Sequence, residues 1–269
     1  MERYRLSFRQ PHIQELMSRL PTYMMLDDHE IEDNWTQDRV SEKTGKYAAA
    51  MHAYQSYQMI HGPAYEPALG PVEKIWYSFR HGAADFFVLD TRTERFIENR
   101  VPRILGDRQM KALLAWLLAP TNNIKFVVSS VPLFPDGRSR SKDKWSGFEA
   151  QRLKLLDFIR DHAIKRVVFL SGDVHCSMTS ELACSTHPDF KVHSIISSSF
   201  FWPYPQGQDS DFDLTGALAR SGESRYEVVK TSDVISADNF TRVTGNSNGI
   251  HVQVYDRKGY KKDSQVYSF

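Results

Sequence analysis

Two short polar stretches, each directly after an apolar run, bring acidic residues and histidines together. The tetrapeptide Asp-Asp-His-Glu at 27–30 follows the apolar run 23–26, and Asp173 and His175 follow the apolar run 167–170. Because open α/β folds build their active sites at the carboxyl ends of strands, we expect both stretches at one edge of a sheet. Carboxylates and imidazoles together hold transition metals and harder cations. The pattern therefore predicts metal-assisted hydrolysis.

These residues also have a structural explanation, because acids at strand ends commonly cap helices or face solvent in turns. Either stretch alone fits that explanation as well as it fits a metal site. The occurrence of two such stretches, each after an apolar run, favours the metal site.

Five further motifs follow in a fixed order along the chain. They are Ser-Phe-Arg-His-Gly at 78–82, the run 84–92 ending in Asp-Thr-Arg, Leu-Gly-Asp-Arg-Gln at 105–109, Ser-Ser-Val-Pro at 129–132 and Asp-Lys-Trp-Ser-Gly-Phe at 143–148. Together with the two polar stretches, this series resembles the PhoD-like (alkaline phosphatase D) family, a branch of the calcineurin-like metallophosphoesterases. The similarity runs from about residue 10 to about residue 200 and more faintly to about 255.

The resemblance implies an α/β fold, a four-layer sandwich of two mixed β-sheets flanked by helices, in a single domain over residues 1–269. It implies hydrolysis of phosphate mono- or diesters by a water molecule that two metal ions activate. Iron and calcium are the expected ions, with manganese and zinc as alternatives. The expected partner is a small phosphate-ester substrate.

The resemblance also assigns roles to the two polar stretches. Asp28 takes a metal-ligand position, with Asp27 as a further candidate ligand, and His29 becomes the acid that protonates the leaving group. Asp173 and His175 match the ligands of the family's Gly-His-x-His motif.

Two arginines are candidate catalytic residues that clamp the substrate phosphate. Arg80 and Arg92 both stand near expected strand ends. A guanidinium fork matches phosphate oxygens and stays charged at all relevant pH values. The alternative role for each is an ion-pair partner on the protein surface.

The chain departs from the family near its start. The family carries an upstream Gly-Asp-x-x-Tyr element, whose Asp bridges two metal ions, but residues 1–26 contain neither Asp nor Gly. The fold is therefore expected to be N-terminally incomplete. The alternative function is a catalytically impaired or non-catalytic relative that binds phosphate esters.

Overall composition narrows the partners. With 34 basic and 33 acidic residues, the chain lacks the positive field that nucleic-acid binding requires. No run approaches the roughly 20 apolar residues of a membrane span, and Met1–Leu6 opens no apolar signal region. We therefore expect a cytoplasmic location for this chain as given, or secretion if a longer precursor exists. Its two cysteines argue against a disulfide framework, and the sequence carries no signal for an oligomeric state.

Periodicity and breakers predict the elements that position these motifs. Helices are expected at 11–20, 107–118 and 146–162, with Asp107 as an N-cap. Strands are expected into Asp27 and at 74–79, 85–90, 124–129, 166–171, 191–198 and 251–255. The strands 124–129 and 166–171 flank a helix, which favours parallel pairing.

Overall fold

A computed structural model of the 269-residue chain describes residues 2–63, 74–98, 101–138, 143–198, 200–201, 207–218 and 225–269. The α-helices are α1 (Glu2–Phe8), α2 (Pro11–Arg19), α3 (Thr44–Tyr57), α4 (Asp107–Leu118) and α5 (Glu149–Asp161), and the 3-10 helices are η1 (Gln37–Arg39), η2 (Met59–His61), η4 (Trp145–Phe148) and η5 (Asp209–Asp211). The strands are β1 (Tyr77–His81), β2 (Ala84–Val88), β3 (Ile124–Val128), β4 (Asp136–Gly137), β5 (Val167–Ser171), β6 (Ser177–Cys184), β7 (Lys191–Ser197), β8 (Phe212–Asp213), β9 (Gly216–Ala217), β10 (Tyr226–Thr231), β11 (Asn239–Asn246), β12 (Gly249–Asp256) and β13 (Lys261–Ser268).

The main structural element is an eight-stranded mixed sheet with the order β1-β2-β3-β5-β7-β6-β10-β9. Strands β2, β3, β5 and β7 run parallel to one another, and the remaining pairs are antiparallel. The predicted parallel pairing of β3 and β5 is confirmed. The carboxyl ends of these four strands therefore share one edge of the sheet.

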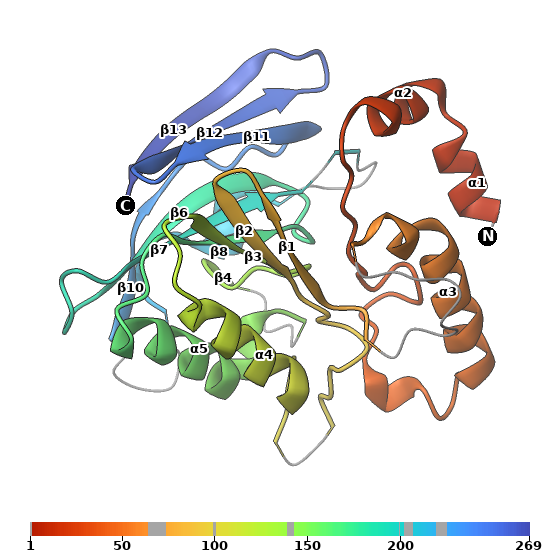
Figure 1. Ribbon diagram of the computed structural model, residues 1–269, viewed down its shortest axis with the longest axis horizontal. Helices are drawn as coiled ribbons and strands as arrows, with labels where there is room; N and C mark the ends of the chain where they lie inside the picture. Colours follow the sequence, from red (N-terminus) through yellow and green to blue (C-terminus); the bar gives the residue numbers. More distant parts are fainter. Residues whose placement is uncertain are drawn as a thin grey trace.

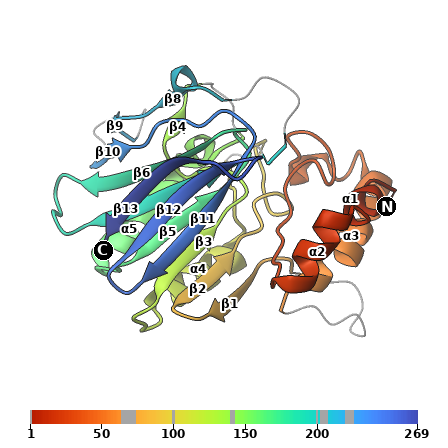
Figure 2. The same ribbon diagram turned by 90° about the horizontal axis from the view of Figure 1, so that it is seen from above.

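The two faces of this sheet are covered differently. Helices α4 and α5 lie on one face, and the antiparallel sheet β11-β12-β13 lies over the other (Figures 1 and 2). Alternation along β3 reflects this arrangement, because Val127 joins the core under the helices whereas Phe126 packs in the cluster with Ile250 and Val252 of the small sheet. Both faces of the central strands are thus buried.

Helices α1, α2 and α3 lie beside the two sheets and not over the outer face of the small one (Figures 1 and 2). The hydrophobic core beside α3 includes Leu26, Trp35 and Tyr54, so it also holds the polar stretch at 27–30 in place. The predicted α/β architecture with two sheets is confirmed. Of the four expected layers, the described residues form three: one helical layer and two sheets.

The expected strand before Asp27 is an extended segment, residues 21–27, that belongs to no sheet. Its anchors are side-chain contacts: Tyr77 Oη donates a hydrogen bond to the Met24 carbonyl (2.8 Å), and the Tyr23 ring stacks on Phe79 with centroids 3.7 Å apart. The strand prediction was wrong because none of the described strands pairs with this segment. The predicted α4 is confirmed, but Gly106 and not Asp107 is its N-cap residue.

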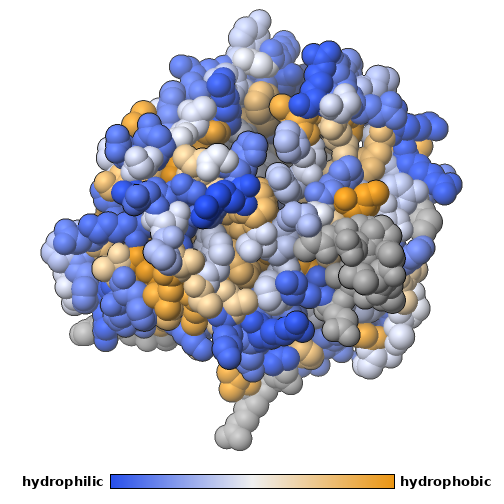
Figure 3. Space-filling view, in the orientation of Figure 1, coloured by the Kyte–Doolittle hydropathy of each residue, from blue (hydrophilic) through white to orange (hydrophobic). Residues whose placement is uncertain are grey.

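Hydrophilic side chains cover most of the face seen in Figure 3, and hydrophobic side chains form separate patches among them. Among the described residues, no helix is both long and apolar enough to cross a bilayer.

Candidate functional site

The candidate site lies at the edge of the large sheet where the parallel strands end. Arg92 follows β2, Ser130 follows β3 and Asp173 follows β5. The extended segment 21–27 delivers Asp28 to the same edge. Residues far apart in sequence therefore meet where open α/β sheets build their sites.

The Asp28 carboxylate is buried and held by backbone donors. Its Oδ1 accepts a hydrogen bond from the His29 amide (2.7 Å), and its Oδ2 accepts one from the Asn34 amide (2.7 Å). Asn34 has φ +54°, which closes the turn around the carboxylate. His29 points outward, with 67% of its side chain exposed.

Asp173 and His175 occupy an unusual turn after β5. Both have positive φ values, +71° and +56°, which non-glycine residues seldom adopt and which often mark functional sites. The turn is held because the Gly172 amide donates to the Ser130 carbonyl (3.1 Å) and the His175 amide to Ser198 Oγ (2.9 Å).

Burial shifts the pKa values of the two titratable side chains in this turn, Asp173 and His175. Burial, with Asp143 and Asp27 nearby, raises the pKa of Asp173 to about 7. Burial, followed by the effects of His29 and Lys144, lowers the pKa of His175. His175 is therefore neutral at pH 7, which is the form of imidazole that binds metals.

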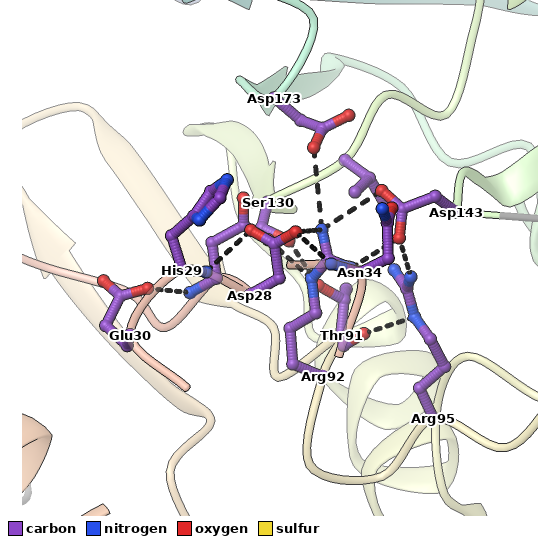
Figure 4. A network of polar contacts seen from close by, with 12 residues as sticks. Asp28, His29, Glu30, Asn34, Thr91, Arg92, Arg95, Ser130, Asp143 and Asp173 are labelled. Atoms are coloured by element: carbon purple, nitrogen blue, oxygen red, sulfur yellow. Dashed lines mark hydrogen bonds and ion pairs between the residues drawn. The ribbon is translucent and has the colours of Figure 1, made fainter. Parts of the chain in front are cut away.

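A buried charge cluster links these loops (Figure 4). The Arg92 side chain, with 0% exposure, places Nε 2.6 Å from Asp27 Oδ1 and Nη1 2.5 Å from Asp143 Oδ1. Its Nη2 lies 3.9 Å from Asp28 Oδ2 and 3.6 Å from Asp173 Oδ1. Arg95 Nη1 reaches the same Asp143 oxygen at 2.5 Å.

The charges of this cluster fit an added cation. Four carboxylates face three cationic groups, so negative charge remains in excess when all seven groups are ionised. The carboxylates are Asp27, Asp28, Asp143 and Asp173, and the cationic groups are Arg92, Arg95 and Lys144. Burial first, and the neighbouring Asp143 and Asp27 carboxylates second, raise the pKa of Asp173, and a bound cation would lower it. A cavity of about 390 Å³ borders Asp27 and Asp173 and leaves room for a ligand beside them.

The three predicted ligands Asp28, Asp173 and His175 are brought to one region but not to a single point. Asp28 and Asp173 are bridged by a nitrogen of Arg92, and Asp28 and His29 act electrostatically on His175. The tightest set of potential ligands among the described residues is Asp28, His29 and Asp33, whose ligand atoms lie within 4.8 Å of one another. Asp28 belongs to both sets.

The sequence predicted Arg80 and Arg92 as phosphate clamps, but in the structure neither is placed to bind a substrate phosphate. Arg80 lies at the opposite end of the sheet, because β1 runs antiparallel to β2, and its Nε pairs with Asp85 Oδ1 at 2.6 Å. Arg92 lies at the site, but its side chain is fully buried and its nitrogens face carboxylates. A buried guanidinium surrounded by acids is not available to a substrate phosphate.

Sequence reasoning missed three residues of this region, Asp143, Arg95 and Asp33. Asp143 opens the quoted motif at 143–148 but received no role, although it binds both Arg92 and Arg95. Asp33 stands five residues after Asp28, and its Oδ1 lies 3.6 Å from His29 Nε2. Two features of the sequence could have pointed to these residues: a second arginine three positions after Arg92, and the additional acids at 30–33.

Comparisons with known proteins show what this chain is similar to. A family model described as PhoD-like phosphatase matches residues 1–211. Alkaline phosphatase D of Bacillus subtilis (strain 168) is 31% identical over 207 residues, which cover 65% of this chain and 33% of that protein. A solved structure described as the structure of PhoD shares the fold, with a TM-score of 0.63 and 19% identity over 91% of this chain and 51% of the solved chain. This chain thus spans about a third of the curated relative and about half of the solved one.

Proposed function

The chain belongs to the PhoD-like phosphatase family, and on that premise we propose that it hydrolyses phosphate mono- or diesters at the carboxyl edge of the large sheet. The observation that carries this proposal is the position of Asp28 Oδ2 and Asp173 Oδ1, 3.9 and 3.6 Å from the same nitrogen of Arg92. Two acidic loops from distant parts of the sequence therefore face each other beside a cavity.

We assign the metal ligands from these positions. Asp28, Asp173 and the neutral His175 would hold an ion, with Asp27 beside them. A bound ion would lower the pKa of a water molecule and neutralise charge on the phosphoryl group. Iron and calcium are the proposed ions, with manganese and zinc as alternatives, since carboxylate and imidazole suit all four.

We assign His29 as the group that protonates the leaving oxygen. Its imidazole is exposed at the site, and its Nε2 lies 3.6 Å from Asp33 Oδ1. A proton delivered from the His29 imidazolium would leave the alcohol as a neutral product. The group Asp28, His29 and Asp33 offers a competing role for His29, as a metal ligand.

One experiment separates these roles. The 269-residue chain is supplied with iron, calcium, manganese or zinc, and hydrolysis of bis(4-nitrophenyl) phosphate, 4-nitrophenyl phosphate and a simple alkyl phosphate ester is measured together with metal content. If His29 is the acid, His29→Asn lowers turnover by about 10²- to 10⁴-fold with unchanged metal content, and less for good leaving groups than for alkyl esters. Loss of the metal together with activity would instead identify His29 as a ligand.

The second candidate, a non-catalytic relative that binds phosphate esters, rests on the Arg92 nitrogen that lies 3.9 Å from Asp28 Oδ2 and 3.6 Å from Asp173 Oδ1 and partly neutralises them without a metal ion. A dinuclear mechanism needs both attacking and leaving oxygens clamped. A chain that binds a phosphate ester but releases no nitrophenol with any of the four metals would support this candidate and contradict the enzymatic one.

A further inference from the structure

The Arg92 guanidinium contacts acids from separate segments through different edges. Its Nε faces Asp27. Its Nη1 and Nη2 form a fork with Asp143 at 2.5 and 3.3 Å, and its Nη2 also faces Asp28 and Asp173 (Figure 4). The segments are the stretch at 27–30, the turn after β5 and the chain before η4. One side chain therefore spans the whole candidate site.

We propose that Arg92 is a positioning residue that sets the separation and orientation of Asp28 and Asp173, and thereby the affinity of the site for a metal ion. The inference rests on the proposed function, because it takes these two acids as ligands. Arg92 touches neither substrate nor ion in this role.

Hydrogen bonds to Asp143 fix the position of the Arg92 guanidinium. Asp143 accepts hydrogen bonds from Arg92 and Arg95, and Arg95 Nε donates to the Thr91 carbonyl at 2.8 Å. Both arginines are fully buried. Because the planar fork presents several donors at fixed angles, it can orient more than one carboxylate at once, whereas a lysine ammonium acts as a compact charge on a flexible stem.

Charge alone would act in the opposite direction. A cation at 3.6 to 3.9 Å from the two acids repels an incoming metal ion. If Arg92 contributed only its charge, its removal would strengthen metal binding. If it positions the acids, its removal lets two buried like charges move apart and weakens metal binding. The sign of the change therefore distinguishes the two explanations.

The test is calorimetric titration of the full 269-residue chain with Mn²⁺ as the probe. Arg92→Lys keeps the charge and removes the fork, and Arg92→Gln removes both. We expect both variants to bind Mn²⁺ about 10- to 100-fold more weakly, the usual effect of losing a group that orients metal ligands. The control is Arg80→Gln, which removes an exposed arginine at the far end of the sheet and should leave Mn²⁺ affinity unchanged.

A second variant conserves charge and changes Asp143, the carboxylate that binds Arg92. In Asp143→Glu the additional methylene displaces the guanidinium while the carboxylate is kept, so Mn²⁺ affinity should fall in the same direction. Circular dichroism and unfolding in chelator establish that each variant folds. Wild-type Mn²⁺ affinity in Arg92→Lys or Asp143→Glu, or tighter binding by Arg92→Gln, overturns the inference. A wild-type chain that binds Mn²⁺ but hydrolyses no ester contradicts only the proposed function, and one that binds no Mn²⁺ contradicts both.

Discussion

Replacing Asp173 by Asn should stabilise the metal-free protein at alkaline pH. The Asp173 side chain is only 16% exposed, and its backbone has φ +71°, a conformation that Asn tolerates better than most residues. The substitution therefore removes the carboxylate charge without adding backbone strain. Stability should rise because this charge is buried without full compensation.

The magnitude follows from the pKa of Asp173, which burial, with Asp143 and Asp27, raises from 3.8 to about 7. Because the folded value exceeds the unfolded one, stability is fully present below about pH 4 and is lost as the pH rises through about 7. At about 1.4 kcal/mol per pKa unit, the charged form lowers the free energy of unfolding by up to about 4 kcal/mol. About 2 kcal/mol of that loss falls between about pH 5.5 and about pH 8.5.

The assay is urea unfolding of wild type and Asp173→Asn in chelator at these two pH values. The advantage of the variant should be larger at the higher pH by about 2 kcal/mol. Asp189→Asn, at an exposed position, is the matched control and should show no pH-dependent advantage. An Asp173→Asn advantage that is equal at both pH values would refute the reasoning, because it would show that Asp173 is not charged at a cost in the native state.

Three further predictions follow from other contacts. Burial, with Lys191 and Lys230, lowers the pKa of His193 from 6.5 to about 4. Up to about 3 kcal/mol of the free energy of unfolding is therefore lost as the pH falls from about 6.5 to about 4, and His193→Phe should remove this loss in urea unfolding. Arg152→Met leaves the buried Asp136 without its partner and should cost about 3 to 5 kcal/mol, and the double change with Asp136→Leu should recover part of it. Asp28→Asn should weaken Mn²⁺ binding by at least about 10-fold and Asp33→Asn by less than about 3-fold, since Asp28 is buried among the proposed ligands and Asp33 is exposed. An equal loss in calorimetric titration would assign the ion to the group Asp28, His29 and Asp33.

Local sequence patterns identified most of the central elements. Helix α4 begins at Asp107 and ends at Leu118 as predicted, and β3, β5 and β7 lie within one residue of their expected bounds. These elements were predictable because apolar spacing and nearby Gly or Pro residues act within a few positions. Strands β6 and β13 were not predicted, because β6 interrupts its apolar positions with Ser, Thr and Glu, and β13 is largely polar.

From the sequence alone, Asp28 and Asp173 were candidate metal ligands because each follows an apolar segment, whereas Asp33 was missed. Which arginine lies between the two candidates depends on the tertiary structure. Arg80 and Arg92 both stand near strand ends, yet the antiparallel turn of β1 carries Arg80 to the far edge, whereas Arg92 enters the buried acid cluster. A strand is predicted from residues that are close in the sequence. The partners of Arg92, Asp27 and Asp143, lie 65 and 51 residues away, so only the packing of the sheet edge brings them together.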